Sequence, residues 1–538
     1  MLSLSIILFA SIFCRSQALT NVGGVLLQDT VWSSTGNANP YYLVNDVQVP
    51  YNSTLTIQAG VQIIFGSGNL EILIKGVLKV QGTANNPVCF YNGSAADTKW
   101  MITFQSTNLT QSLISHAVFT GPKKGLQTKK SAPGLQQNAG ILVIQNTAFV
   151  GETTIETNGR LSGNYPLPRV LPAPSLKLTS VVINDSMVST GNDMSEPILI
   201  INSKLFNATA RPAAALGGIQ FLNSKLQTLT IIMGKDYYGH SGILEFNDST
   251  VDNAVKSCLN EWCSSSLHIR AFRSVIRHSS FKVAAYSYED YIQNSFIIDS
   301  STFRNVSIDA SGLYYYYDGA AIPYSIFMNN SIFHTGDIRL GSFPKSAMFQ
   351  NSKFQETNIA AGTSDRYGPW PGINITNVIF QNGSLILPVS NVAIMYSTIV
   401  LGVPPLVLGD NSIISCSSIK RFSSVLQAST TGIQATTITI TQSSISSFEV
   451  GLQVTPLSMQ TSSISSSNFI SNSQFNIQNV GVYDVQAAGN WWGSSNDTAI
   501  HNKIYDYWDN INYGQVLYSN YSNVKLPAEN DCPSYSPV

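Results

Sequence analysis

Carboxylates are scattered along this 538-residue chain, but two of them that converge in one groove could cleave a glycosidic bond as general acid and base. The candidates for such an enzyme are Asp236, Glu289, Asp290 and Asp318. Glu289 and Asp290 are adjacent, but an adjacent acidic pair is more often part of a solvated loop than a catalytic dyad. His268, followed by Arg270, and His278 precede this pair, and the case for either histidine as a base is weaker still.

Aromatic residues in the same stretch recur at a regular interval. Tyr237, Trp262 and Tyr314 each come eleven residues after an apolar residue of a repeating unit, and Tyr286 and Tyr288 come ten and twelve residues after another. An aromatic ring offers a flat apolar surface to the C–H face of a sugar, while nearby carboxylates accept hydrogen bonds from its hydroxyls. If these five side chains face outward, they form a glycan-binding strip. The alternatives are rings stacked inside a core, or rings selected only for strand propensity.

The six cysteines indicate one short disulfide and no metal site. Cys258 and Cys263 are close enough in sequence to form a bridge, and closing so short a loop contributes about 2 kcal/mol. Cys89, Cys416 and Cys532 stand alone, with no histidine at ligand spacing, so a zinc site is excluded and their pairing is left open. We expect no metal and no other cofactor.

A weak repeat positions these residues. It consists of a polar residue, often Asn, then Ser or Thr, any residue and an apolar anchor, as in Asn202-Ser203-Lys204-Leu205. From Leu205 to Ser462-Ser463-Ile464 the anchors lie 19 to 30 residues apart. The unit is therefore about 24 residues long, a period found in leucine-rich repeats and in parallel β-helices.

Residue types decide between these two solenoids. The leucine framework of leucine-rich repeats is missing, whereas β-branched and aliphatic residues occur in short alternating runs such as Leu70, Ile72 and Ile74. Charged residues make up only 11% of the chain, because stacked like charges repel, whereas Asn, Ser and Thr can bond to their own kind in every coil. We therefore predict an all-β fold, a parallel β-helix solenoid of roughly fifteen coils.

The end of the chain predicts a capping helix. Asn496-Asp497-Thr498, followed by Ile500, Ile504 and Trp508, fits a capped helix whose apolar stripe covers the last coil. Such a cover would protect the open end of a solenoid from association. The predicted parts are a signal peptide (1–18), an N-terminal cap with the first coils (19–120), coils (121–489) with protruding loops (121–140 and 151–175), a C-terminal cap (490–521) and a tail (522–538).

The N-terminal segment predicts export from the cell. Its apolar stretch is too short to span a membrane. It is followed by Ser16-Gln17-Ala18, a small-x-small pattern at which a leader peptide is cut. Asn-x-Ser/Thr acceptors agree with a secreted, extracellular glycoprotein, although a chain rich in these residues also produces them by chance. The acceptors are Asn52, Asn92, Asn108, Asn184, Asn207, Asn247, Asn305, Asn329, Asn374, Asn382, Asn496 and Asn520. The net charge of −1 excludes a general attraction to nucleic acid or to an anionic membrane.

Two segments near the ends carry a further pattern. The first comprises residues 55–65 and 76–88, and the second is Gly489-Asn490-Trp491-Trp492-Gly493 with Ile504-Tyr505-Asp506. They resemble the opening coils and the terminal motif of extracellular right-handed parallel β-helix proteins of the pectin-lyase-like superfamily, and similar coils occur in bark beetle-type surface proteins. The resemblance implies a right-handed β-helix. It implies little about activity, because the superfamily includes lyases, hydrolases, adhesins and binding proteins.

Three functions follow as expectations. The first is a secreted glycan-binding or matrix-interaction module without catalysis, with extracellular glycans or matrix proteins as partners. The second is a polysaccharide lyase or glycoside hydrolase that uses the four carboxylates above. Polygalacturonases of similar fold use clustered aspartates and a Gly-His-Gly piece, and the nearest match in this chain is Gly239-His240-Ser241. The third is a structural or adhesive rod, which needs neither carboxylates nor aromatic strip.

Overall fold

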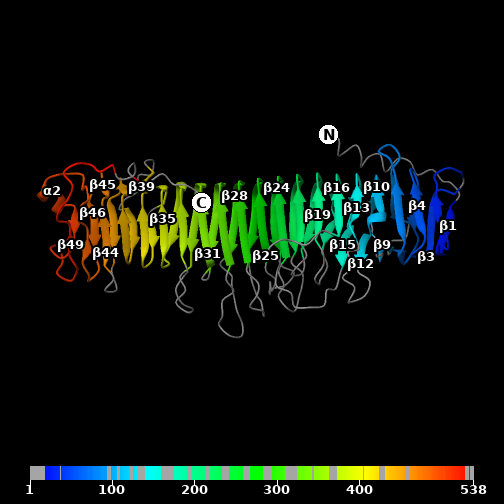
Figure 1. Cartoon of the computed structure of the whole chain (residues 1–538), viewed down its shortest axis with the longest axis horizontal. Helices are drawn as coiled ribbons and strands as arrows, with labels where there is room; N and C mark the ends of the chain where they lie inside the picture. Colours follow the sequence, from blue (N-terminus) through cyan, green and yellow to red (C-terminus); the bar gives the residue numbers. More distant parts are fainter. Residues whose placement is uncertain are drawn as a thin grey trace, which may run out of the picture. The chain divides into compact units, whose positions relative to one another are not determined.

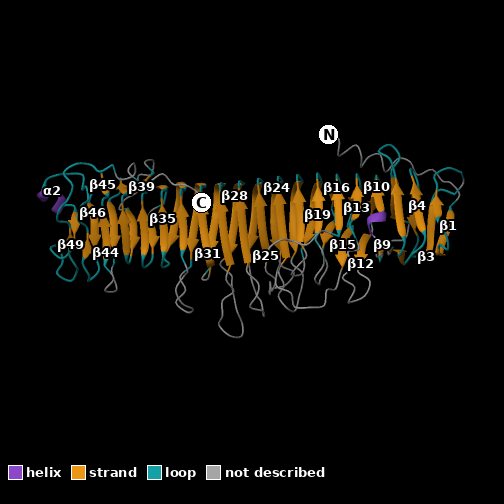
Figure 2. Ribbon diagram, viewed as in Figure 1, coloured by secondary structure: helices purple, strands orange, loops and turns teal. Residues whose placement is uncertain are grey.

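In the computed structural model, most of the described residues belong to β-strands. The described residues are 19–36, 38–93, 98–105, 109–121, 125–129, 140–158, 175–190, 197–212, 218–232, 242–257, 267–282, 294–310, 324–341, 344–362, 372–403, 405–422, 430–455, 461–527 and 532. The predicted signal peptide (1–18) lies outside them. Strands dominate the described residues, and the helices are short (Figure 2).

The chain divides into two compact units, residues 1–230 and 231–538. In each unit the strands form two parallel sheets, which we call sheet A and sheet B. In the first unit, sheet A contains β1 (Thr20–Val25), β3 (Tyr41–Val49), β5 (Gln62–Phe65), β6 (Asn69–Ile74), β8 (Val88–Asn92), β9 (Lys99–Phe104), β11 (Ala117–Thr120), β12 (Gly125–Lys129), β14 (Ala148–Val150), β15 (Thr154–Asn158), β17 (Val182–Asn184), β18 (Met187–Ser189) and β20 (Lys204–Arg211). Sheet B of this unit contains β2 (Thr30–Trp32), β4 (Thr54–Gln58), β7 (Val77–Gln81), β10 (Leu113–Ser115), β13 (Leu142–Gln145), β16 (Leu176–Thr179), β19 (Ile198–Ile201) and β21 (Gly218–Leu222). Strand β22 (Lys225–Ile232) runs across the boundary between the units.

The second unit repeats this arrangement. Its sheet A contains β24 (Thr250–Ser257), β26 (Val275–Lys282), β28 (Thr302–Ala310), β30 (Ile332–Leu340), β32 (Lys353–Ala361), β34 (Ile379–Leu387), β36 (Thr398–Leu401), β37 (Leu406–Leu408), β39 (Ser418–Arg421), β40 (Thr431–Ala435), β42 (Ser444–Ser446), β43 (Val450–Val454), β45 (Asn468–Ile470), β46 (Phe475–Asn479) and β48 (Ile504–Tyr505). Its sheet B contains β23 (Gly242–Asn247), β25 (Leu267–Phe272), β27 (Asn294–Asp299), β29 (Tyr324–Asn329), β31 (Pro344–Gln350), β33 (Ile373–Thr376), β35 (Val392–Met395), β38 (Ser412–Ser415), β41 (Ile438–Thr441), β44 (Ser462–Ser465), β47 (Val485–Gln486) and β49 (Val516–Leu517). Within the unit, successive coils lie side by side in sequence order (Figure 1).

The prediction of stacked parallel strands is confirmed, but the fold has more coils than the roughly fifteen predicted from the sequence. Each coil contributes one strand to sheet B, which within the described residues has eight strands in the first unit and twelve in the second. The coils were counted by their Asn-Ser turns, and the opening coils lack this signature. In those coils the positive-φ turn positions are occupied by Gly60 and His116. The Asn-Ser pattern therefore does not identify these coils in the sequence.

The Asn-Ser pattern has a conformational origin. In the second unit, two residues connect each sheet B strand from β23 to β44 with the next sheet A strand. The first of the two has positive φ, for example 48° at Asn330 and 49° at Asn351. Asn adopts this left-handed conformation more readily than most residues. The serine that follows is buried, and its hydroxyl accepts a hydrogen bond from the backbone N–H of the preceding coil, as in Ser301 N to Ser331 Oγ (3.1 Å) and Ser331 N to Ser352 Oγ (3.1 Å).

One copy of the repeat was assigned to the wrong strand. Ile464 lies in β44 of sheet B and pairs with Ile440, whereas the other anchors of the second unit lie in sheet A. The true anchor of that coil is Phe469, which follows Ser467-Asn468 and pairs with Ile445. The serine-rich sequence here repeats Ser-Ser-Ile in both sheets, so the residue types alone did not separate them.

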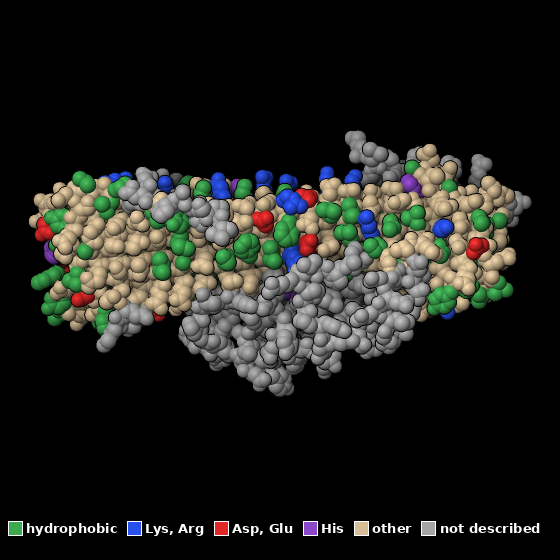
Figure 3. Space-filling model, in the orientation of Figure 1, with side chains coloured by type: hydrophobic (Ala, Val, Ile, Leu, Met, Phe, Trp, Pro, Cys, Tyr) green, Lys and Arg blue, Asp and Glu red, His purple; other side chains and the backbone are tan. Residues whose placement is uncertain are grey.

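Inward positions hold apolar side chains that stack from coil to coil. The predicted alternation is confirmed in β6, where Leu70, Ile72 and Ile74 are buried. In the first unit, Phe119 stacks on Phe90 at 4.7 Å and on Phe149 at 4.9 Å between ring centroids. On the face shown in Figure 3, the described surface is mostly uncharged.

The two segments predicted as loops each contain a strand. Strand β12 lies inside 121–140, and β15 lies inside 151–175. Leu126 and Ile155 point inward and are fully buried, and the two residues pair in register. Neighbouring glycines, lysines and prolines make these short strands hard to recognise in the sequence. Residues 122–124, 130–139 and 159–174 of the two segments lie outside the described residues.

The predicted capping helix is much shorter than expected. Helix α2 (Asp497–His501) begins after Asn496, whose side chain accepts a hydrogen bond from Ala499 N, and its Ile500 is buried. Ile504 belongs instead to β48, which pairs with β46. Trp508 is 69% exposed, so the stripe that was predicted to cover the last coil does not form. The other helix of the described residues is the single 3-10 turn η1 (Leu109–Gln111).

The tail returns over earlier coils of the second unit. Ser522 N donates to Asn490 O, and Leu526 exchanges two hydrogen bonds with Asn468, all at 2.9 Å. Cys532 then forms a disulfide with Cys416, 116 residues earlier in the chain. The bridge resolves a pairing that the sequence left open.

None of the helices in the described part of the chain is long and apolar enough to cross a membrane.

Candidate functional site

The coils of the second unit have two unlike edges. At the tight-turn edge, where a sheet B strand leads into a sheet A strand, two residues separate β23 from β24 and β25 from β26. At the loop-bearing edge, where a sheet A strand leads to the next sheet B strand, nine residues separate β24 from β25 and eleven separate β26 from β27. The aromatic and carboxylate residues that the sequence singled out lie, in sequence, between a sheet A strand and the next sheet B strand, whereas His268 and His278 lie in β25 and β26.

Every predicted aromatic and carboxylate residue of that edge lies outside the described residues. Tyr237 and Asp236 fall in 233–241, Trp262 in 258–266, Tyr286, Tyr288, Glu289 and Asp290 in 283–293, and Tyr314 and Asp318 in 311–323. Cys258 and Cys263, the predicted short bridge, also lie outside them. These predictions therefore stay predictions.

The strands that flank these segments are described, and they are in register. Gly242 pairs with Leu267 at the start of β23 and β25, and Asn294 pairs with Tyr324 at the start of β27 and β29. At the other end, Lys282 of β26 pairs with Asp309 of β28. The four segments therefore re-enter the fold at one edge, in successive coils.

The outward face of sheet B beside this edge is partly buried. Ile243 and His268 alternate with inward residues and pair with each other, yet they are only 3% and 4% exposed. Burial, with a smaller effect from Arg270, lowers the pKa of His268 from 6.5 to about 3. A histidine with this pKa is neutral at physiological pH and does not supply a charged group to a ligand.

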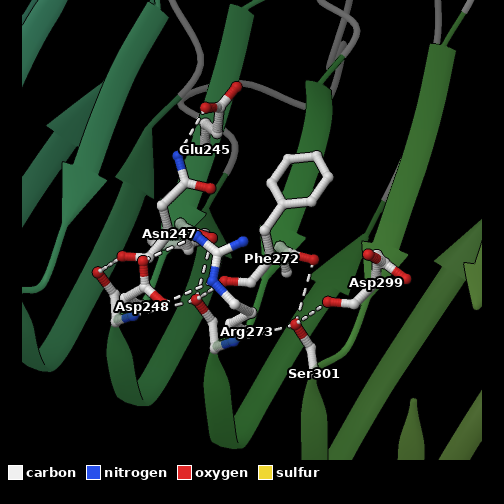
Figure 4. Close-up of polar contacts among 11 residues, drawn as sticks. Glu245, Asn247, Asp248, Phe272, Arg273, Asp299 and Ser301 are labelled. Atoms are coloured by element: carbon white, nitrogen blue, oxygen red, sulfur yellow. Dashed lines mark hydrogen bonds and ion pairs between the residues drawn. The ribbon is translucent and has the colours of Figure 1, made fainter. Parts of the chain in front are cut away.

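Further along the same face, acids and arginines form pairs (Figure 4). Glu245 contacts Arg270 at 3.6 Å between Oε2 and Nη1, and its other oxygen accepts a hydrogen bond from Asn247 Nδ2 at 2.7 Å. The Arg273 guanidinium donates two hydrogen bonds of 2.8 Å to Asp248. This bidentate contact lowers the pKa of the Asp248 carboxyl.

The pairing bears on the enzymatic alternative. A general acid needs a carboxyl whose pKa is raised toward neutrality, whereas the pKa of Asp248 is lowered. On sheet A, Asp252 contacts His278 at 2.9 Å, so this histidine, weighed above as a base, lies beside a carboxylate at an exposed position. Within the described residues, no group of three or more acidic, His or Cys side chains could hold a metal ion.

The first unit contains a polar row that the sequence analysis missed. Gln127, Glu156, Ser189 and Arg211 face outward and pair in register across four coils of sheet A. Burial raises the pKa of Glu156, against smaller lowering effects from Arg211, Ser189 and Lys129. The only available signal was the alternation around Ile155, in a segment that was predicted as a loop.

The glycosylation acceptors fall into exposed and half-buried groups. The exposed ones are Asn52, Asn207, Asn305, Asn374, Asn496 and Asn520, the half-buried ones are Asn92, Asn184, Asn247, Asn329 and Asn382, and Asn108 lies outside the described residues. Both polar atoms of Asn92 are engaged, because Nδ2 donates to Gly121 O at 2.8 Å and Oδ1 accepts from Trp100 Nε1 at 2.6 Å. A glycan at Asn92 would break these bonds, so the exposed acceptors are the better candidates.

Tryptophans of the terminal motif have structural contacts. Trp492 is 2% exposed and its ring stacks on Phe469 at 5.1 Å, while Gly493 has a φ of 83° that permits the sharp exit from the coil. These contacts give Trp492 a packing role at the end of the coils.

Neither protein-family models nor curated proteins gave a match to this chain.

Proposed function

We propose that this chain is a secreted, non-catalytic β-solenoid protein that binds extracellular glycans at the loop-bearing edge of its second unit. One observation carries the proposal: the strands flanking the four aromatic-containing segments are paired in register. Neighbouring strands lie about 4.8 Å apart, so segments that leave from successive coils start close together. Tyr237, Trp262, Tyr286, Tyr288 and Tyr314 would then line up as the predicted strip.

A rigid scaffold with variable loops at one edge is a common way to build a binding site. The serine turns fix the opposite edge of each coil, so loops can vary in length without changing the register of the strands. Matrix proteins are the second class of partner that such a surface would suit.

Secretion is part of the proposal. Disulfides persist in oxidising compartments and are rare in the cytosol, and the Cys416–Cys532 bridge agrees with the leader predicted at 1–18. We also propose that the solenoid is a right-handed β-helix of the pectin-lyase-like kind. Buried Ile500 supports a role for α2 in covering the end of the second unit.

The test is to incubate the purified protein, with and without calcium, on insoluble acidic and neutral polysaccharides and to score retention and released oligosaccharide together. Retention without release, lost in Trp262→Ala or Tyr314→Ala, is expected. Tyr51→Ala is the matched control, because Tyr51 is an exposed tyrosine of the first unit.

The other outcomes select the alternatives. Released oligosaccharide would overturn the non-catalytic proposal and direct attention to Asp236, Glu289, Asp290 and Asp318. Neither retention nor release would leave a structural or adhesive rod as the better interpretation.

A further inference from the structure

The largest exposed aromatic surface among the described residues lies at the end of the second unit. The segment 506–514 follows β48 and carries Tyr507, Trp508 and Ile511, which are 38%, 69% and 78% exposed. An exposed tryptophan is unusual, since this side chain is normally among the more buried. Tyr507 and Trp508 meet edge to face, with 5.6 Å between ring centroids and 81° between planes, and form two apolar walls of a corner.

Hydrogen bonds hold this segment in one conformation. The Asp506 carboxylate is 3% exposed and accepts hydrogen bonds from Trp508 N (3.0 Å) and Val516 N (2.8 Å). Asp509 N and Asn510 N both donate to Asp506 O, and Asp509 Oδ2 accepts from Asp506 N. The backbone around Trp508 is therefore ordered before any ligand arrives, which reduces the entropic cost of binding.

Both ends of the segment are tied to the coils. Tyr507 N donates to Gly514 O, and Gly514 N donates to Gly481 O at 2.8 Å. The Asn479 side chain, which is buried, donates to Gly514 O as well, also at 2.8 Å. Trp508 is thus an exposed ring on a fixed support and not the end of a frayed chain.

We propose that Trp508 and Tyr507 form a second glycan site, specific for a neutral sugar and independent of the loop-bearing edge. The exposed corner suits one pyranose ring, whose C–H face packs on Trp508. Asp509 Oδ2 and Asn510 Oδ1 accept hydrogen bonds within the segment, so the hydroxyl partners for a sugar are the other carboxylate oxygen of Asp509, the Asn510 amide nitrogen and the Asn512 amide oxygen. The surface is small: a Trp, a Tyr and an Ile present on the order of a few hundred Å², below the ~800 Å² that each partner contributes to a stable protein interface.

Charge selects among sugars. Acidic residues neighbour the corner along the chain: Asp506 and Asp509 lie on either side of Tyr507 and Trp508, and Asp484 accepts a hydrogen bond from Gln515 N at the end of the segment. These carboxylates would repel a uronate polymer and tolerate a neutral ring. The site therefore differs in ligand class from an acidic-polysaccharide receptor.

The experiment is a titration of the intact protein with neutral hexasaccharides of glucose, mannose, xylose and N-acetylglucosamine, and with polygalacturonate, followed by tryptophan fluorescence and calorimetry. At least one neutral hexasaccharide should bind, and Trp508→Ala should weaken it at least about tenfold. Trp508→Phe, which keeps a smaller ring, should give an intermediate loss. Asp506→Asn should weaken binding although the ring is retained.

Val403→Ala is the matched control, because Val403 is an exposed apolar residue of the same unit, 62% exposed, on a different coil. In a Trp262→Ala background, which removes binding at the loop-bearing edge, the Trp508-dependent part of the binding should persist, so failure here and failure of the loop-bearing edge can be told apart. Absence of binding to every neutral hexasaccharide, or Trp508-dependent binding of polygalacturonate, would overturn the proposal. Trp508-dependent self-association in sedimentation, or binding to phosphatidylcholine vesicles, would overturn it in favour of a protein or membrane contact.

Discussion

The tight-turn edge and the loop-bearing edge of the second unit differ in how much variation they accept. At the tight-turn edge two residues separate the strands in every coil from β23 to β44. At the loop-bearing edge the separation ranges from two residues, between β40 and β41, to thirteen, between β28 and β29. The same coils are therefore strictly periodic on one side and irregular on the other.

The difference follows from where the backbone hydrogen bonds go. At the tight-turn edge, the Ser274 N–H donates to Ser301 Oγ at 3.0 Å, and Ser301 Oγ donates to the carbonyls of Asp299 and Ala271. An inserted residue would separate these groups and leave buried donors without partners, which is costly. Among the described residues of the loop-bearing edge, comparable contacts occur in later coils with shorter connections, as in Asn411 N to Thr437 Oγ1 (3.4 Å) and Ile438 N to Ser462 Oγ (3.2 Å). Insertions into the long connections from β24 to β29 cost little beyond loop closure. Function can then vary at one edge while the other preserves the fold.

The disulfide should give the largest effect, because it ties the tail along the tight-turn edge. Replacing both Cys416 and Cys532 by Ser should destabilise the last coils by up to about 5 kcal/mol, the chain-entropy value for a closed loop of this length. Chemical unfolding, compared with and without reductant, measures the loss. Cys89→Ser, in the first unit, is the control and should behave as the unmodified protein. An unchanged unfolding midpoint in the double variant would show that the hydrogen bonds of Leu526 and Ser522 hold the tail by themselves.

The serine ladder should give the next effect. Ser301→Ala removes the acceptor of Ser274 N in a buried position and should lower the free energy of unfolding by about 2 to 3 kcal/mol. Ser280→Ala, at an exposed position of β26, should change it by less than about 0.5 kcal/mol. Equal effects of the two substitutions would contradict the view that the ladder sets the strict spacing of this edge.

The third effect is a pH dependence of the free energy of unfolding, caused by His268 beside the loop-bearing edge. His268 has a folded pKa of about 3 and an ordinary value of 6.5, so the unfolded chain binds a proton between these values and the folded chain does not. Its contribution to stability is complete above pH 6.5 and is lost as the pH falls toward 3. Between about pH 7.5 and about pH 5 the loss is roughly 2 kcal/mol.

The measurement compares unfolding free energies of the unmodified protein and His268→Gln across this range. The variant lacks the titrating group, so its free energy of unfolding should fall less on acidification. The difference in unfolding free energy between the two proteins should change by roughly 2 kcal/mol between about pH 7.5 and about pH 5. Parallel pH curves would mean that His268 is not buried as a neutral group, and the loop-bearing edge would then be open to solvent.

The sequence predicted the tight-turn edge far better than the loop-bearing one. Asn351-Ser352 and its counterparts recur because one residue type tolerates positive φ and another fits the buried ladder, so each coil leaves the same mark in the sequence. The coils were not recognised where other residues replace the Asn-Ser pattern, as at Gly60 and His116. One anchor was assigned to the wrong sheet where the pattern occurs in both sheets, as at Ile464.

At the candidate site, sequence reasoning was limited by long-range contacts. The pairing of Glu245 with Arg270 requires knowledge of strand register, since the two residues lie 25 positions apart and have no shared local pattern. The exposure of Trp508 depends on where α2 ends, and the apolar spacing of Ile500, Ile504 and Trp508 fits a longer helix equally well. The Cys416–Cys532 bridge depends on the path of the tail.

The smallest effect is expected from a contact that looks strong in the structure. Arg273 and Asp248 form a bidentate pair at the tight-turn edge, yet their side chains are 61% and 42% exposed. Solvent and salt screen such a pair, so Arg273→Met should cause no resolvable change in the unfolding midpoint. Arg270→Met is the matched substitution. Its partner Glu245 is only 14% exposed, and removal of the arginine leaves that carboxylate in a poorly solvated position, so a clear loss of stability is expected. If Arg273→Met were the more destabilising of the two, charge pairing and not the serine ladder would control the tight-turn edge, and the contrast between the two edges would have to be redrawn.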